Sequence, residues 1–167
     1  WTLLNPMLTS FVLWVIFSFV FAARLPGQQQ FAPYLMAGIL LTTFFNQGVL
    51  SSAESIAHNG AILSKIYVPP QIFPIATSIA GLLNFFIGMI PLALVCIISR
   101  QAISWKFPLV ILVGICLALL VSGIGLVLSI LFIRFDDTRN IVNILLMILI
   151  YITPVFYPLS ILGPRLQ

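Results

Sequence analysis

Charged side chains are scarce in this sequence. Lys and Arg together number seven and Asp and Glu three, so that 6% of the 167 residues are charged and 62% are hydrophobic. Soluble domains carry about 25% charged residues, and a soluble fold could not cover this much apolar surface. Several uncharged stretches of 23 residues or more separate the charges, long enough to cross the ~30 Å hydrocarbon core of a bilayer. The composition indicates an integral membrane protein and leaves no room for a separate soluble domain in these residues.

Motifs that define other classes of protein are also missing from the sequence. The basic residues stand singly and form no patch, which excludes a nucleic-acid-binding surface. Cys96 and Cys116 lie in apolar stretches without the spacing of a disulfide or zinc site, and we expect them to be packing residues. Neither Lys65 nor Lys106 follows a glycine, so the phosphate-binding loop of a nucleotide hydrolase is missing. We expect no catalytic residue, metal or cofactor in this chain, and the energy for any uphill transport must come from another subunit.

Five apolar runs bounded by polar, charged or proline-containing segments predict five transmembrane helices in an all-α fold. The longest uncharged run, residues 66–99, would form a helix of about 50 Å, which exceeds one membrane crossing. Pro69, Pro70 and Pro74 hinder a helix near its start, so the third span should begin near Pro74. Pro91 predicts a kink inside that span. The predicted spans are residues 2–23, 31–53, 74–98, 107–133 and 141–158.

Small residues recur along the fourth predicted span. Gly114, Ala118, Ser122, Gly125 and Ser129 follow one another at spacings of 4, 4, 3 and 4, which places them on one helix face. Such a face lets a neighbouring helix approach closely, and close approach drives helix association in lipid. We expect this face to be a packing seam.

The few charges leave the function open. All ten fall at the edges of predicted spans, which disfavours a carrier driven by protons or ions. The basic residues divide four to three between alternate loops, so the positive-inside rule does not decide the orientation. Glu54 and His58 could meet one helical turn apart, and Asp136 and Asp137 are adjacent, but no third ligand or nucleophile stands at a defined spacing to either pair. These features alone fit a transporter or a membrane scaffold.

Three local patterns, in order along the chain, carry a family resemblance. The first lies in residues 59–74, the second is the segment Arg134-Phe-Asp-Asp-Thr-Arg139, and the third is Thr153-Pro-Val-Phe-Tyr-Pro158. Together they resemble the permease subunits of ABC type 2 exporters, and more narrowly the branch that exports polysaccharides such as O-antigen, capsule or teichoic acid. The positions that match in the first two patterns are Asn59, Leu63, Lys65, Tyr67, Pro69, Pro74, Arg134, Phe135, Asp137 and Arg139. Pro70 and Asp136 stand where that branch usually has Arg.

The resemblance implies a permease with six membrane spans and both termini in the cytoplasm of a bacterium. The permease would sit in the inner membrane as a homodimer, in contact with lipid, together with two ABC ATPase subunits that bind ATP and Mg. Its substrate would be a lipid-linked glycan. We therefore expect this chain to be a piece of the full permease that lacks an N-terminal interface helix and the last span.

The resemblance also assigns roles to two loops, which would both be cytoplasmic. The loop from Glu54 to Tyr67, after the second span, is where an ATPase could push on the membrane part through a short rigid helix. The residues expected to couple the ATPase are Glu54, His58, Asn59, Leu63 and Lys65. Those expected in the second cytoplasmic loop, after the fourth span, are Arg134, Asp137 and Arg139.

Aromatic residues are candidates for the substrate pathway. Phe11, Trp14 and Phe21, with Ser18 between the last two, fall on one face of the first predicted span. Tyr151, Phe156 and Tyr157 lie in the last predicted span beside Pro154. Aromatic rings offer sugars a surface to slide along, although aromatic residues in membrane helices most often pack against neighbouring helices or lipid.

Two other functions compete with glycan export. An ABC type 2 permease for drugs or small lipids would have the same topology, and a non-transport membrane scaffold would also lack intramembrane charge. A neighbouring ATPase gene among glycosyltransferase genes would favour glycan export.

Overall fold

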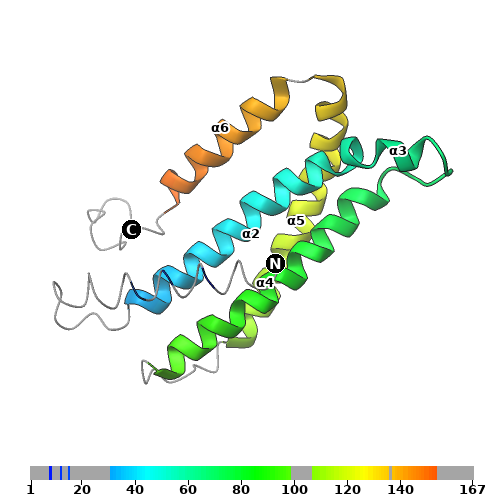
Figure 1. Cartoon of the computed structure of the whole chain (residues 1–167). Helices are drawn as coiled ribbons and strands as arrows, with labels where there is room; N and C mark the ends of the chain where they lie inside the picture. The colour runs from blue at the N-terminus through cyan, green and yellow to red at the C-terminus, as the bar shows by residue number, and fades with distance from the viewer. Residues whose placement is uncertain are drawn as a thin grey trace.

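The computed structural model describes residues 31–98, 107–135 and 137–153, together with Leu8, Val12 and Val15. Its helices with defined bounds are α2 (Phe31–His58), α3 (Gly60–Leu63), α4 (Ile72–Ile98), α5 (Phe107–Arg134) and α6 (Asp137–Ile152). The described residues contain no strand, which confirms for this part of the chain the prediction of an all-α fold (Figure 1).

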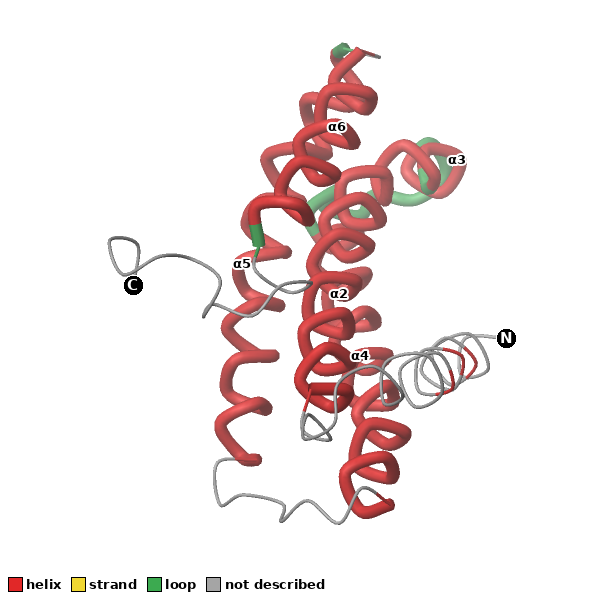
Figure 2. Tube along the Cα trace, turned by 90° about the vertical axis from the view of Figure 1, so that its left-hand side faces the viewer, coloured by secondary structure: helices red, strands yellow, loops and turns green. Residues whose placement is uncertain are grey.

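Three long helices form the body of the structure. The helix α2 packs along both α4 and α5, and α4 also packs on α5. The connection from α2 through α3 to α4 and the connection from α5 to α6 lie at the same end of this bundle (Figure 2). From there α6 runs back beside the bundle and contacts α5 and α2 sparsely (Figure 1).

The helix bounds confirm some predicted span limits and correct others. The helices α4 (Ile72–Ile98) and α5 (Phe107–Arg134) match the predicted spans 74–98 and 107–133, and Pro91 lies inside α4. The helix α2 (Phe31–His58) does not end with the predicted span at residue 53. Residues 51–58 contain no Gly or Pro that would end the helix, and Ser55 and Ile56 remain buried against the bundle, so the helix continues through them. Glu54 and His58 therefore lie on a helix and not in a loop.

The last predicted span also shifts. The helix α6 begins at Asp137, four residues before the predicted start at residue 141, and it ends at Ile152. Residues 154–158 of that span, and the first span apart from the helical positions Leu8, Val12 and Val15, lie outside the described residues. The number of spans in the whole chain therefore stays a prediction.

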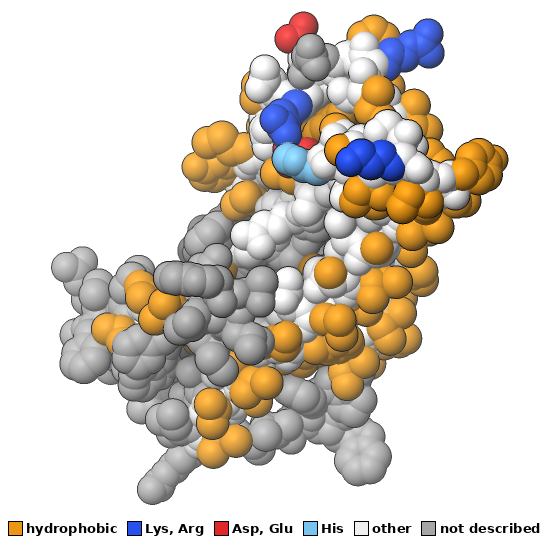
Figure 3. All heavy atoms as spheres, turned by 45° about the vertical axis from the view of Figure 1, so that its right-hand side comes forward, with side chains coloured by type: hydrophobic (Ala, Val, Ile, Leu, Met, Phe, Trp, Pro, Cys, Tyr) orange, Lys and Arg blue, Asp and Glu red, His pale blue; other side chains and the backbone are white. Residues whose placement is uncertain are grey.

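The described surface is that of a membrane protein. Two segments, Ile72–Leu94 and Leu109–Arg134, are long and apolar enough to cross a membrane. Large hydrophobic side chains are exposed along α4, α5 and α6, among them Leu83, Leu119 and Ile144 (Figure 3). So much exposed apolar surface is rare on soluble monomers, whereas apolar side chains that face lipid tails carry no free-energy penalty.

The small-residue seam on α5 is confirmed with one change. Gly114, Ala118, Gly125 and Ser129 are buried, but Ser122 is partly exposed and the fully buried Val121 takes its place. A Cβ atom added to Gly114 would lie 2.7 Å from Cε1 of Phe85 on α4, and one added to Gly48 of α2 would lie 3.0 Å from Cγ1 of Val121. Because glycine has no side chain at these positions, the three helices can touch.

Ser52, Pro74 and Gly125 bring α2, α4 and α5 into contact at one point, which we call the helix junction. The hydroxyl of Ser52 on α2 donates to the carbonyl oxygen of Pro74 on α4 at 3.0 Å, and that of Ser78 donates to the same oxygen at 2.8 Å. All three residues are buried. Gly125 of α5 covers Ser52 so closely that an added Cβ would overlap the Ser52 hydroxyl. Interhelical hydrogen bonds of this kind contribute about 1 kcal/mol in membrane proteins.

The helix junction predicts opposite effects of one substitution at two glycines of α5. Gly125→Ala should destabilise the full-length permease by about 1–3 kcal/mol, because the added methyl overlaps the Ser52 side chain, which is itself held between two helices. Gly123→Ala is the matched control, since nothing lies within 4 Å of its added Cβ and Ala is the better helix former by up to ~1 kcal/mol. Thermal unfolding in detergent measures both. Equal stability of the two variants would show that the close approach at Gly125 is unimportant.

Candidate functional site

All described charged side chains lie at one end of the bundle, where α2 and α5 end and α4 and α6 begin (Figure 3). We call this the charged end. Its charged and titratable residues are Glu54, His58, Lys65, Arg134, Asp137 and Arg139. The structure thus brings both predicted cytoplasmic loops together at one end.

Glu54 joins the two segments directly. One of its carboxylate oxygens lies 2.6 Å from Nη2 of Arg139, and the other lies 3.4 Å from Nε2 of His58. The Glu54 side chain is 26% exposed, compared with 52% for Arg139 and 70% for His58. Because Arg139 lies in the first turn of α6, the pair fastens the start of α6 to the end of α2. Partly exposed pairs of this kind contribute up to about 1 kcal/mol.

Asn59 shapes the turn between α2 and α3. Its side-chain Nδ2 donates to the carbonyl oxygen of Ser55 at 2.7 Å, and its backbone N–H also bonds to that oxygen at 3.2 Å. Its own carbonyl oxygen accepts from the N–H groups of Ile62 and Leu63 at 3.0 and 3.1 Å. Asn59 therefore ends one helix and starts the next, which accounts for the residue type without any contact to a partner.

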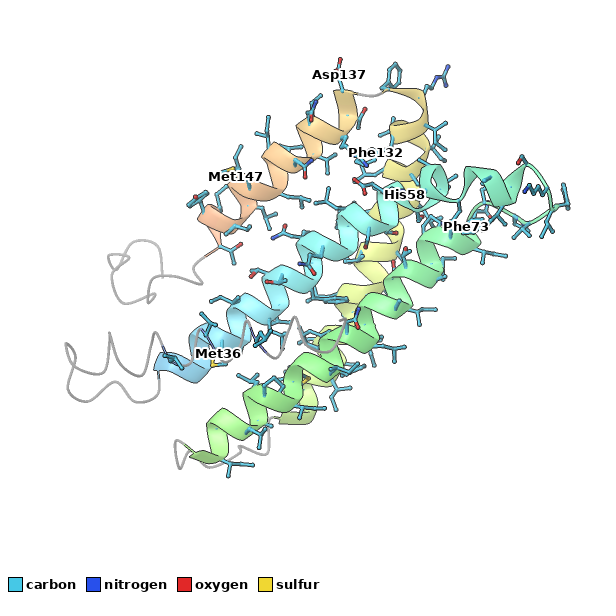
Figure 4. The ribbon with its side chains drawn as sticks, viewed as in Figure 1. Met36, His58, Phe73, Phe132, Asp137 and Met147 are labelled. Atoms are coloured by element: carbon cyan, nitrogen blue, oxygen red, sulfur yellow. The ribbon has the colours of Figure 1, made fainter. Side chains whose placement is uncertain are left out.

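The connection after α3 projects beyond the ends of α2 and α4 (Figure 4). Leu63 is partly buried, whereas Lys65 and Ile66 are exposed and Tyr67 is fully exposed. A solvated turn would not need large apolar side chains on its outside. The projection therefore presents a mixed basic and apolar surface formed by Lys65, Ile66 and Tyr67.

Arg134 and Asp137 occupy the turn from α5 to α6. Arg134 is the last residue of α5 and Asp137 the first of α6. Each charge therefore has the sign that the helix dipole stabilises at that end. Both side chains are exposed, and among the described residues the only ion pairs are those of Glu54. Their positions favour a role in ending and starting helices.

Only one of the six aromatic candidates for the substrate pathway falls within the described residues. Tyr151 lies in the last turn of α6, away from the charged end, and is 68% exposed. The others, Phe11, Trp14, Phe21, Phe156 and Tyr157, lie outside the described residues, so the pathway assignment stays a prediction.

Sequence reasoning missed two features of this region. It placed Glu54 and Arg139 in separate loops, because nothing in the sequence pairs residues so far apart. It also missed the junction of Ser52 and Pro74, although Ser52 lies near the end of an apolar run where a buried hydroxyl needs a partner.

Comparisons with known proteins agree with the earlier resemblance. The family model described as ABC-2 type transporter matches residues 1–167. The chain is 31% identical over 164 residues to the O-antigen export system permease protein RfbA of Myxococcus xanthus, covering 96% of this chain and 60% of that protein. It is 24% identical over 160 residues to a protein of the same name from Klebsiella pneumoniae, covering 94% of this chain and 60% of the relative. The chain thus spans about 60% of the length of these relatives.

The ion pair predicts a charge-swap rescue. Glu54→Arg and Arg139→Glu should each lower the stability of the full-length permease by about 1 kcal/mol, because each places like charges in contact. The double variant Glu54→Arg, Arg139→Glu should recover most of that loss. Lys65→Glu makes the same change of charge at an exposed residue of the same end that is in neither ion pair, and it should have a smaller effect. Thermal unfolding measures all four, and additive losses in the double variant would contradict a direct pair.

Proposed function

The chain belongs to the ABC-2 type transporter family, and from this membership we propose that it forms the membrane-spanning part of an ATP-driven exporter of lipid-linked polysaccharide. The names of its relatives in Myxococcus xanthus and Klebsiella pneumoniae, both O-antigen export system permeases, support this substrate class. The transported molecule would be a glycan of the O-antigen, capsule or teichoic-acid type, moved across the bacterial inner membrane by a multi-pass protein.

The observation that carries the proposal is the charged end. The segments that match the family patterns after α2 and after α5 meet there, and the Glu54–Arg139 pair joins them. An ATPase that docks at this end would contact both segments at once. ATP and Mg would bind to that partner, and this chain would supply the docking surface.

The projecting connection fits such a docking role. Ile66 and Tyr67 present apolar surface to a partner and Lys65 adds a positive charge, so an apolar groove with an acidic rim would be complementary. A push on α3 would reach α2 through the hydrogen bonds of Asn59 and would reach α6 through Glu54 and Arg139. Packed helices pass on such a displacement as a rigid-body movement.

The proposal places the charged end in the cytoplasm. Lys65 and Asp137 would face the cytoplasm, while the turns after the first and third spans would face outward. Two copies of the full permease, each with six spans and both termini in the cytoplasm, would assemble with two ATPase subunits. The apolar face of α6, which includes Ile144 and Ile148, would be covered by the second copy or by lipid.

The aromatic residues would guide the glycan. Tyr151 is exposed in the part of α6 farthest from the charged end, which suits a ring near the exit side of the membrane. Phe11, Trp14, Phe21, Phe156 and Tyr157 would extend this surface. Rings stack on the C–H faces of sugars without strong hydrogen bonds, so the chain would slide without being held.

Deleting the gene for the full permease tests the proposed function. The cell should lose its surface glycan and accumulate the lipid-linked glycan on the cytoplasmic side, and a plasmid copy should restore export. Deletion of the partner ATPase gene should have the same effect. Normal surface glycan in the permease deletion would contradict the proposal, and loss of drug resistance with normal glycan would favour a drug permease.

Docking at the projection predicts a selective loss of coupling. The double variant Lys65→Ala, Tyr67→Ala should keep the permease folded and dimeric, because both side chains are exposed, but should lower its stimulation of the ATPase by about tenfold. Export should fall in parallel. Gln71→Ala, an exposed change in the same connection but past its prolines, is the control and should leave both near wild type. ATPase assays on the reconstituted complex decide, and full stimulation by the double variant would place the contact elsewhere.

A further inference from the structure

The exposed side of α2 differs from that of every other long helix in the described structure. Between residues 36 and 58 no large hydrophobic side chain is exposed, whereas α4, α5 and α6 expose many. The exposed positions in this part of α2 are Thr43, Gln47, Ser51, Ala57 and His58. The helix is as long as α5, yet only α4 and α5 contain a segment apolar enough to count as a membrane span.

The exposed polar residues form one continuous face. Thr43, Gln47, Ser51, Glu54 and His58 follow one another at spacings of 4, 4, 3 and 4, so they line the same side of the helix. We call Thr43, Gln47 and Ser51 the α2 polar face. It continues into the charged end through Glu54 and His58. In Figure 3 backbone and uncharged polar side chains, drawn in white, extend down from the His side chain at that end.

With the charged end at the membrane surface, the α2 polar face extends deep into the membrane. At 1.5 Å per residue, Gln47 lies about 16 Å and Thr43 about 22 Å along the helix from His58, well inside a hydrocarbon core of ~30 Å. The hydrogen bond between Ser52 and Pro74 sets the level of the antiparallel α4 against α2. Asn84 of α4, ten residues beyond Pro74, therefore lies at the depth of Thr43, and it too is exposed.

Polar side chains at this depth need polar surroundings. The Ser51 hydroxyl donates to the backbone carbonyl oxygen of Gly48 at 3.2 Å, so the requirement rests mainly on the Gln47 amide, which would lose its hydrogen bonds to water in lipid. Polar residues inside membranes therefore face protein or a water-filled cavity. The face opens at the charged end, where water reaches it. A face that is polar along its length and open to water at one end has the chemistry of a wet passage rather than of a lipid-facing surface.

We propose that the α2 polar face lines the wet passage of the exporter and hydrogen-bonds the hydroxyl groups of the glycan as it passes. This rests on the proposed function. Hydroxyl and amide groups match a substrate rich in hydroxyls, and each such bond contributes only about 0.5–1.5 kcal/mol, weak enough to exchange as the chain moves. The absence of charge at Thr43, Gln47 and Ser51 lets neutral and anionic sugars pass alike. The glycan would enter past Glu54 and His58.

Thiol accessibility tests whether the face is wet. Cysteine replaces Thr43, Gln47 or Ser51 in full-length permease that lacks Cys96 and Cys116, and membrane vesicles are treated with a charged methanethiosulfonate. The matched control is Leu83→Cys, which is 59% exposed on α4 at the depth of Thr43. We expect reaction at the three α2 sites at least tenfold faster than at Leu83→Cys, because a thiol in lipid stays protonated and out of reach.

Two results would overturn the wet face. Reaction with an apolar maleimide only, at the same rate as Leu83→Cys, would mean that the face meets lipid. Oxidative cross-linking of Gln47→Cys between two copies, without reaction with the charged reagent, would mean that the face is an interface between copies.

Export measures the contact with glycan. Gln47→Leu should lower export three- to tenfold while the permease still stimulates its ATPase, and Gln47→Asn should retain most export because it keeps the amide. Normal export by Gln47→Leu would mean that the α2 polar face does not hydrogen-bond the glycan. Thiol accessibility needs no substrate, so it tests the wet face by itself, whereas failure of the wild-type permease to export glycan would contradict the proposed function instead.

Discussion

The contact of α2 with α4 and α5 at the helix junction is the constraint on which the rest of the structure depends. The Ser52 hydroxyl donates a hydrogen bond to the carbonyl oxygen of Pro74, and Gly125 leaves room for the Ser52 side chain. This one point sets the depth of α4 relative to α2 and presses α5 against them. The charged end lies just beyond it, so the spacing of the segments after α2 and after α5 follows from the junction.

The charged end shows how a few polar residues can attach a sparsely packed helix to the bundle of a membrane protein. The helix α6 buries only Val142 and Leu146, so packing alone holds it loosely. The pair of Glu54 and Arg139 adds a second attachment at its first turn. Because the same end carries the projection with Tyr67, a force applied there has a short route to the helix that is least constrained by the bundle.

The surfaces of the helices divide the surroundings of the protein into two kinds. The helices α4 and α5 present Leu, Ile and Val outward and suit lipid, while α2 presents hydroxyl and amide groups over the same depth. An apolar side chain has about the same free energy against protein as against lipid tails. Folding in lipid alone therefore does not explain why the outer side of α2 is polar while those of α4 and α5 are apolar. It points to a polar neighbour for α2, which under the proposed function is water and the glycan.

The sequence by itself determined that the chain is helical, that it belongs in a membrane, and where α4 and α5 run, because long apolar runs and prolines act locally. The family patterns and the seam of small residues on α5 were also visible in it. Only the tertiary structure decided that Glu54 pairs with Arg139 and that Ser52 bonds to Pro74, since these contacts join residues far apart in the chain. It also decided that Ser122 leaves the seam and that Thr43, Gln47 and Ser51 stay uncovered. Spacing puts residues on one helix face, but only the neighbouring helices determine whether that face is buried.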